Sequence, residues 1–340
     1  MTDALHRLTG DDPLEAVWRK EPRVFRPADP PTDLLTLTDL DAVLDSRLLR
    51  LPYLELVTTE RTVDPSRFCP PRTVQGRPVH GYPDPAAVRN LVADQHTLLL
   101  RYVDHWHAPV TAFCAHLATA LRRKVEAFYF VTPPGTQGRP VHRDDADVFA
   151  VQITGAKDWY IHDGPPADGH WTPDRTDSPG PLRLSTRLEP GQVLYVPRGF
   201  AHRAVAVEGT VSTHLSLTVR EAGTPHLRAL LNSLLTEGPA SLPPRPGTDA
   251  DLIDTAGQLL DHARKVLAEL DGTSLLDAVR TSMVAAHAPA ATAPTFQELA
   301  ATTRGRGRPL CSWSSTMPVG LIAGQGRNRD GNTAVPHRDG

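Results

Sequence analysis

Residues 125–219 consist of short β-type segments separated by glycine and proline, and this pattern constrains the fold more than any other feature of the chain. Short strands with turn residues at close intervals are typical of antiparallel sheets that pack face to face or close on themselves. The expected strands are residues 125–131, 147–154, 158–162, 192–196, 203–207 and 210–219. We therefore expect a double-stranded β-helix, or jelly roll.

Helical patterns flank this barrel, because apolar residues recur there three and four positions apart. The expected helices are residues 109–121, 225–235, 252–270 and 274–286. The predicted fold class is therefore mainly β with flanking helices, in which a C-terminal helical module follows the jelly roll.

Four regions follow from these patterns. Residues 1–89 are expected to form an α/β segment that packs on the barrel, and residues 90–220 the catalytic barrel itself. Residues 221–301 form the helical module. Residues 302–340 show only arginine, glycine, proline and serine punctuation without periodicity, so we expect an irregular tail.

Three polar residues of the barrel have the types and spacing of a metal site. His142 and Asp144 flank Arg143, and alternate side chains of an extended segment point to the same side. His202 follows a distant strand and its turn, so it can face the same cavity. Two histidines and one carboxylate on one face of an octahedron hold iron(II) and leave positions open for a cosubstrate and oxygen.

The alternative is that these residues are ordinary polar side chains. A chain with 15 histidines produces such triples by chance, which would make His142 and Asp144 loop residues and His202 a solvent-facing strand residue. Residues 188–197 favour the metal site, because a tight turn followed by an apolar strand places His202 at the mouth of a barrel.

The amino-acid composition indicates which partners and which location to expect. Lys and Arg total 36 against 39 Asp and Glu, a formal net charge of -3, so no global basic field indicates direct nucleic-acid binding. The three cysteines lie far apart, which argues against disulfides and thiolate zinc sites. No leader or uninterrupted apolar run of about 20 residues is visible, so we expect a cytoplasmic protein without a membrane partner.

Several segments together resemble the JmjC-class ribosomal oxygenases, also called cupin-like protein hydroxylases. The segments that carry the resemblance are residues 131–138, 142–152, 155–159, 195–199 with His202, and 212–214. The resemblance implies a JmjC/cupin-like barrel that uses iron(II), held by His142, Asp144 and His202, and 2-oxoglutarate. It also implies hydroxylation of an amino-acid side chain in a protein or peptide, with the β-carbon of arginine or histidine as the first guess.

The same resemblance implies that Lys157 binds the distal carboxylate of 2-oxoglutarate. A buried dianion needs a fixed cation, which supports this role, whereas the alternative is a surface lysine near the turn at Gly155. Gln152 and His214 are further candidates for cosubstrate contacts. Their structural alternatives are a glutamine that caps a gap in the core and a satisfied core histidine.

Two departures from the family pattern lie where a substrate would enter. Residues 137–141 read Gln-Gly-Arg-Pro-Val, where relatives often have an aromatic residue after the glycine. Arg143 replaces the more usual aromatic or aliphatic residue between the ligands. These changes affect the expected substrate more than the expected chemistry.

Two other functions remain open. The enzyme could hydroxylate a biosynthetic peptide or a free amino acid, or the barrel could be a non-catalytic metal-binding cupin that senses a small ligand. By resemblance the expected partners are a protein substrate, with a ribosomal protein as one candidate, and a second copy bound through the helical module. Leucines at helical spacing support such a homodimer: Leu227, Leu230, Leu231 and Leu234, then Leu252, Leu259, Leu260 and Leu267.

Overall fold

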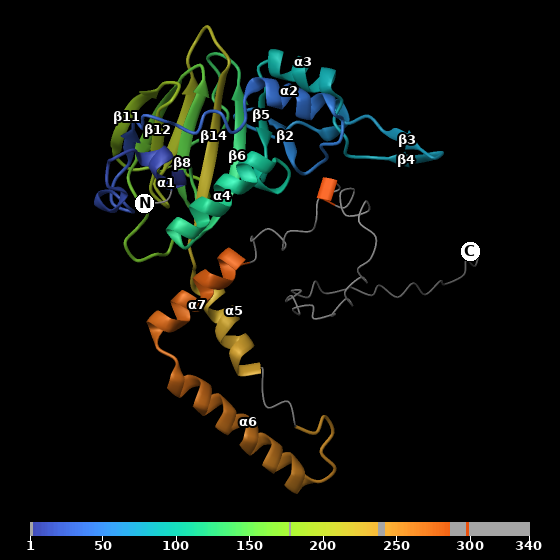
Figure 1. The fold of residues 1–340 in the computed structure, drawn as a ribbon, viewed down its shortest axis with the longest axis vertical. Coiled ribbons are helices and arrows are strands. Elements are labelled where there is room, and N and C mark those ends of the chain that lie inside the picture. The colour runs from blue at the N-terminus through green and yellow to red at the C-terminus, as the bar shows by residue number, and fades with distance from the viewer. Residues whose placement is uncertain (1–2, 177, 237–241, 286–296, 299–340) are drawn as a thin grey trace, which may run out of the picture. The chain divides into compact units, whose positions relative to one another are not determined.

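The computed structural model describes residues 3–176, 178–236, 242–285 and 297–298 (Figure 1). Contacts divide the chain into two units, Met1–Pro289 and Ala290–Gly340, and all the named helices and strands belong to the first. The tail expected over residues 302–340 lies outside the described residues.

Two antiparallel sheets form the barrel. The larger sheet runs, in order, through β1 (Arg23–Phe25), β12 (Val193–Val196), β8 (Asp147–Thr154), β14 (Ser212–Arg220), β6 (Lys124–Thr132), β5 (Thr97–Leu100) and β2 (Leu54–Val57). The smaller sheet runs through β10 (Asp174–Arg175), β7 (His142–Arg143), β13 (His202–Ala206), β9 (Lys157–His162) and β11 (Leu182–Leu188).

The sheets pack face to face, because side chains from both meet in one apolar cluster. Val148 and Ala150 of β8 pack there with Trp159 and Ile161 of β9. Phe149, between the first two, belongs to the other core on the outer face of the larger sheet. Strand β8 is thus buried on both faces, and the arrangement is the predicted double-stranded β-helix.

Helices cover the outer face of the larger sheet. Val110, Phe113 and Leu117 of α4 (Ala108–Leu121) share a core with Tyr129 of β6, and Figure 1 shows α4 beside this strand. The other helices before the barrel strands are α1 (Asp3–Thr9), α2 (Leu37–Asp45) and α3 (Pro85–Ala93), with short 3-10 turns at Leu14–Ala16, Pro65–Arg67 and Val103–His105.

The N-terminal segment is part of the larger sheet as well as its covering. Strand β1 pairs with β12 at one edge, and β2 pairs with β5 at the other. The two remaining strands, β3 (Arg72–Val74) and β4 (Arg77–Val79), form a separate hairpin. The domain boundary at residue 89 stays a prediction, because strands on both sides of it share one sheet.

Three helices follow the barrel: α5 (Thr224–Thr236), α6 (Asp249–Glu269) and α7 (Gly272–Ala285). Arg280 of α7 joins them to the barrel through two hydrogen bonds to the buried carboxylate of Glu221, which lies just past β14. The region has the predicted helical character. No described helix combines the length and hydropathy of a membrane span.

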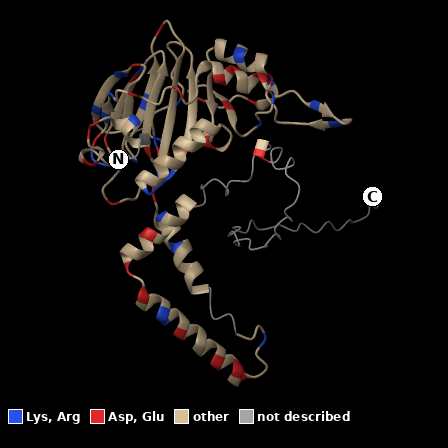
Figure 2. Cartoon of the chain, in the orientation of Figure 1, with Lys and Arg blue, Asp and Glu red and all other residues tan. Residues whose placement is uncertain are grey.

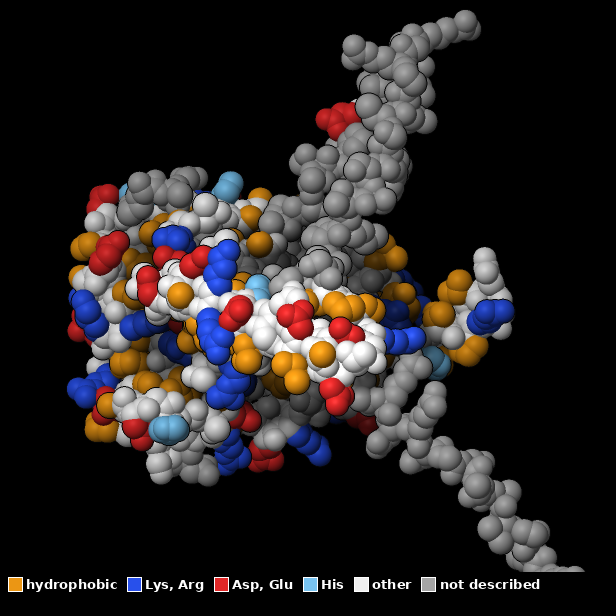
Figure 3. All heavy atoms as spheres, turned by 90° about the horizontal axis from the view of Figure 1, so that it is seen from below, with side chains coloured by type: hydrophobic (Ala, Val, Ile, Leu, Met, Phe, Trp, Pro, Cys, Tyr) orange, Lys and Arg blue, Asp and Glu red, His pale blue; other side chains and the backbone are white. Residues whose placement is uncertain are grey.

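Helix α6 exposes apolar side chains. Its acidic residues are visible along the ribbon in Figure 2, and hydrophobic side chains lie among charged ones at the surface seen in Figure 3. The exposed apolar residues of α6 are Leu252, Ile253, Leu259, Leu260 and Leu267.

Candidate active site

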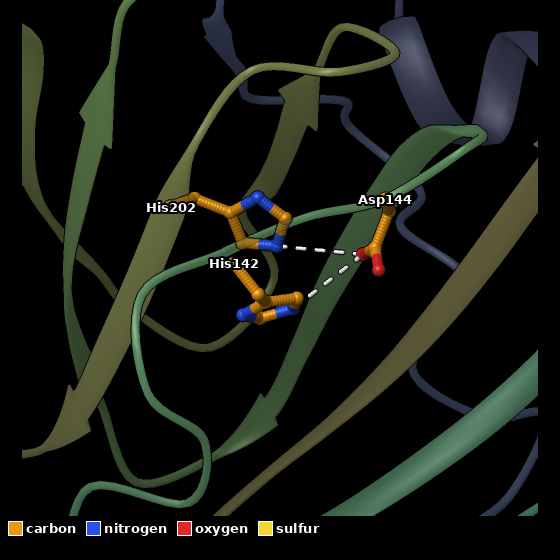
Figure 4. Close-up of side chains that lie close together, drawn as sticks. All are labelled: His142, Asp144 and His202. Carbon is orange, nitrogen blue, oxygen red and sulfur yellow. Dashed lines mark ion pairs between the residues drawn. The ribbon is translucent and has the colours of Figure 1, made fainter. Parts of the chain in front are cut away.

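The three predicted ligands meet between neighbouring strands of the smaller sheet. His142 of β7 pairs directly with His202 of β13, and Asp144 follows β7 (Figure 4). Asp144 Oδ2 lies 3.7 Å from His142 Nε2 and 3.5 Å from His202 Nε2. One ligand atom from each residue lies within 4.8 Å of the other two, which is close enough to share one ion.

Backbone carbonyls orient both imidazoles. His142 Nδ1 lies 2.9 Å from the carbonyl oxygen of Pro140, and His202 Nδ1 lies 3.0 Å from that of Phe200. A carbonyl oxygen can only accept, so each Nδ1 carries the proton and each Nε2 keeps a free lone pair on the side of Asp144. Such contacts fix the tautomer that a metal ligand requires.

Burial and mutual charge set the ionisation of the group. Burial, together with the neighbouring His142, lowers the pKa of the His202 imidazole to about 4. Burial alone would raise the pKa of Asp144, but its interactions with His142 and His202 outweigh this and hold that pKa below its usual range. Near neutral pH His202 is therefore neutral and Asp144 ionised, the states that bind a metal.

The donor set fits iron(II). Two imidazole nitrogens and one carboxylate oxygen are the donor set of the facial triad in mononuclear non-haem iron oxygenases. Within the part of the chain that the structure describes, no other group of three histidine, cysteine or acidic side chains comes close enough to hold an ion.

Lys157 is a buried cation in the same cavity as the triad. Its Nζ donates to Thr132 Oγ1 at 2.9 Å and contacts His214 Nδ1 at 3.0 Å. Burial lowers the pKa of Lys157 to about 7, and among the described residues no carboxylate pairs with it. Because a buried ammonium without a counter-ion is costly, this position is suited to an anionic ligand.

His214 supports Lys157. Its ring stacks on Phe130 with centroids 4.6 Å apart and meets Trp159 edge-on. Burial, and then the charge of Lys157, lower the pKa of His214 well below its usual value, so the ring is neutral and accepts from the ammonium through Nδ1. The structure thus brings His214 to the predicted place.

Gln152 is not brought to the cavity, although it was expected to contact the cosubstrate. Its Nε2 donates to the carbonyl oxygen of Thr154 at 2.9 Å and to Ser212 Oγ at 2.8 Å, at the turn between β8 and β9. Gln152 alternates with Val148 and Ala150 along β8, as predicted, but it lies beyond the end of the cavity. These contacts correspond to the structural alternative.

Arg143 also differs from expectation. Its Nη1 donates to the carbonyl oxygens of Asp163 and Gly199, and its Nη2 to that of Pro179. The side chain is absent from the cavity lining, so it ties loops around β7 together and does not meet an entering substrate.

The cavity lies between the two sheets and has a volume of about 260 Å³, near the lower end of the range of roughly 300–1,000 Å³ for small-molecule sites. Besides the predicted residues, it is lined by Arg101, Thr132, Phe130, Arg139 and Arg220. No motif in the sequence indicates that Arg101 lines the cavity. Phe130 and Thr132 alternate along β6, so they lie on one face of that strand. The sequence does not show which face points into the cavity.

The comparisons with known proteins agree with this architecture. Residues 105–227 match the model of the JmjC domain. The bifunctional lysine-specific demethylase and histidyl-hydroxylase NO66 of Drosophila sechellia is 28% identical over 216 residues, 60% of this chain and 30% of that protein. Ribosomal oxygenase 1 of Rattus norvegicus is 33% identical over 147 residues, 41% of this chain and 24% of that protein. The chain thus spans less than a third of the length of these relatives.

A solved structure shares the fold. The Escherichia coli ribosomal oxygenase YcfD superposes with a TM-score of 0.50 at 21% identity, over 78% of this chain and 68% of that chain. The matched JmjC region contains the metal triad and Lys157. Residues 105–227 are therefore similar to the JmjC domain, in agreement with the resemblance that the sequence motifs carry.

Proposed function

We propose that this protein is an iron(II)- and 2-oxoglutarate-dependent oxygenase that hydroxylates an amino-acid side chain in a protein or peptide. The observation that carries the proposal is that the His142, Asp144 and His202 triad lines one cavity with the buried Lys157, which no described carboxylate pairs with. A barrel that only held a metal would not need that cation.

The residues divide the work of binding. The triad would hold the metal through Nε2, Nε2 and a carboxylate oxygen, and Lys157 would pair with the distal carboxylate of 2-oxoglutarate while its ammonium donates to the Thr132 hydroxyl. When bound, iron(II) allows 2-oxoglutarate to be decarboxylated to succinate while one atom of O₂ enters succinate and the other enters a substrate C–H bond.

Binding of the cosubstrate changes the protonation of Lys157. Burial holds its pKa at about 7 in the protein alone. A carboxylate beside the ammonium favours the charged form, so the pKa rises in the complex. Neutral His214 adds no competing positive charge, and its Nδ1 restrains the ammonium in place.

The substrate belongs to the protein or peptide class by analogy with the relatives, whose names include a ribosomal oxygenase and a histidyl-hydroxylase. The β-carbon of a histidine or an arginine is the first candidate for hydroxylation, and a ribosomal protein is one candidate partner. A cytoplasmic location accords with such a partner.

We also propose that a second copy of the chain covers α6. Five exposed apolar residues on one helix form a larger apolar surface than scattered leucines would. A homodimer through the helical module would remove them from water, in line with the family resemblance.

The function is tested by comparing cell peptides from a strain with the protein, a strain without it, and a strain with His202→Ala. We expect a peptide that gains the mass of one oxygen atom only with the wild type. An identical peptide pattern in all three strains, from protein shown to bind iron and 2-oxoglutarate, would favour the ligand-sensing cupin.

A further inference from the structure

The cavity lining is strongly basic. Besides Lys157 it contains Arg101, Arg139 and Arg220, and its one carboxylate, Asp144, belongs to the metal triad. After iron and 2-oxoglutarate bind, no acidic side chain of the described lining is left to receive a cationic substrate.

Two of the arginines are paired with carboxylates outside the lining. Arg220 Nε lies 2.9 Å from Glu126 Oε2, and Arg101 Nη2 lies 2.7 Å from Glu55 Oε2. Their charges are partly balanced, although Arg101 Nε is buried without a hydrogen-bond partner among the described residues. Arg101 therefore keeps a donor to offer.

Arg139 is balanced least. Its nearest carboxylate is Asp144, where Nη1 and Oδ1 are 3.9 Å apart, and that carboxylate is committed to the metal. The Arg139 side chain is 41% exposed, so it lines the cavity and also reaches solvent. This combination places a spare cation at the entrance, beside the triad.

The segment that carries Arg139 is anchored. The side chain of Gln137 donates to the Arg139 carbonyl oxygen at 2.9 Å, and the Gln137 carbonyl oxygen accepts from Thr59 Oγ1. Pro140, the next residue after Arg139, accepts through its carbonyl oxygen the hydrogen bond that orients the imidazole of His142. The guanidinium is thus presented from a fixed backbone, which reduces the entropy lost when it binds an anion.

These observations bear on the substrate that the proposed function leaves open, and the inference rests on that function. An arginine side chain at the metal would enter beside Arg139 and Lys157 with no free carboxylate in the described lining, so charge repulsion and desolvation disfavour it. Leu99 and Phe128 instead offer apolar lining for an uncharged side chain.

We propose that the enzyme takes an acidic peptide, in which an uncharged residue reaches the metal and a neighbouring aspartate or glutamate pairs with Arg139. Arg139 is then a specificity-determining residue. Among the two first candidates the geometry selects histidine, in its neutral form, over arginine.

The test uses metal-loaded protein with 2-oxoglutarate and synthetic peptides that carry a central histidine, asparagine or leucine flanked by aspartate or by lysine, plus a central-arginine set. Binding is measured without oxygen, and peptide oxidation under air. The variants are Arg139→Glu and, as a control with the same change in charge, Arg187→Glu, whose side chain is exposed and pairs with Asp158.

We expect wild type and Arg187→Glu to prefer the aspartate-flanked peptides by roughly 10- to 150-fold, the value of a charge-assisted contact. Arg139→Glu should lose this preference and favour the lysine-flanked peptides.

Three results would overturn the inference: equal binding of the two flanking sets by wild type, tighter binding of central arginine, or a preference for the aspartate-flanked peptides that Arg139→Glu retains. Binding of no peptide at all would overturn it too. The proposed function fails separately, by the absence of iron-dependent 2-oxoglutarate binding and of peptide-independent succinate in the same samples.

Discussion

The ammonium of Lys157 donates to Nδ1 of His214 over 3.0 Å, so a buried cation is held by a neutral imidazole and not by a carboxylate. Burial lowers the pKa of both groups, to about 7 for Lys157 and well below the usual value for His214. The pair is thus prepared for an anion that the protein itself does not supply.

The first prediction concerns pH. Lys157 is protonated below its pKa of about 7 and binds 2-oxoglutarate in that form, so above this pH binding must take up a proton. We expect the apparent affinity to weaken by up to about tenfold per pH unit above neutrality, until the raised pKa of the complex is reached. Calorimetry in buffers of different ionisation enthalpy measures both the affinity and the proton uptake.

Lys157→Arg is the control, because a guanidinium stays charged throughout this range. If that variant binds at all, its affinity should not vary with pH there. A pH-independent affinity of the wild type, without proton uptake, would show that Lys157 is not the titrating group.

The second prediction concerns Gln152. Replacing it with Ala leaves Ser212 Oγ and the carbonyl oxygen of Thr154 without their donor, so we expect a loss of about 1–3 kcal/mol in the free energy of unfolding. The dissociation constant of 2-oxoglutarate should stay the same. A higher dissociation constant in a stably folded variant would show that Gln152 does contribute to the cosubstrate site.

The third prediction concerns Glu221, whose buried carboxylate pairs with three arginines: Arg19, Arg123 and Arg280. Burial would raise the pKa of Glu221, but these cations and the Ala222 amide outweigh it and lower the pKa to about 2. Glu221→Gln should destabilise the fold by about 3 kcal/mol, the lower end for breaking a buried pair, since the arginines are partly exposed. Urea unfolding at neutral pH measures this loss.

The sign of the pH dependence follows from the lowered pKa. The stabilisation by Glu221 is complete above the ordinary pKa of 4.5 and disappears as the pH falls from there to about 2. The difference in stability between wild type and Glu221→Gln should shrink over that interval. Exposed Glu189, changed to Gln, should alter stability by less than about 0.5 kcal/mol. A similar effect of both substitutions would contradict the special role of Glu221.

The fourth prediction concerns the exposed face of α6. We expect a dimer at micromolar concentration by sedimentation, and a monomer after Leu259→Glu combined with Leu260→Glu. Leu182→Glu on β11, which is comparably exposed, serves as the control and should leave the dimer intact. A wild-type monomer would remove the second copy as the partner of this face.

The metal triad and the strands around it could be predicted because they depend on local pattern. A run of β-type residues between turns located β8 at the same residues as in the structure, and the His-x-Asp spacing identified two of the ligands. Strand β11 went unpredicted although its leucines alternate, since its polar residues obscured the pattern. The edge strands β1 and β2 are too short to show any period.

A repeated hexapeptide shows why the rest could not be predicted. The sequence Gln-Gly-Arg-Pro-Val-His occurs as residues 75–80 and again as residues 137–142. In the first copy the Gln-Gly pair turns the hairpin of β3 and β4, whereas in the second the glutamine bridges to Val205 and the histidine is a metal ligand. Tertiary partners, which a short segment does not encode, decide between these structures. The same limit applied to Arg101, whose place in the cavity depends on how β5 pairs with its neighbours.

The central claim is that Lys157 is the anion site of a 2-oxoglutarate oxygenase, and its most direct test is the dissociation constant of 2-oxoglutarate for iron-loaded wild type, Lys157→Ala and Lys157→Met. Metal content is checked in each, and Lys157→Met keeps most of the side-chain volume. We expect both variants to bind iron and to lose 2-oxoglutarate affinity by roughly 10- to 150-fold, which corresponds to about 1.5–3 kcal/mol for a charge-assisted contact. Equal affinities in the three proteins, with iron bound in all, would contradict the account.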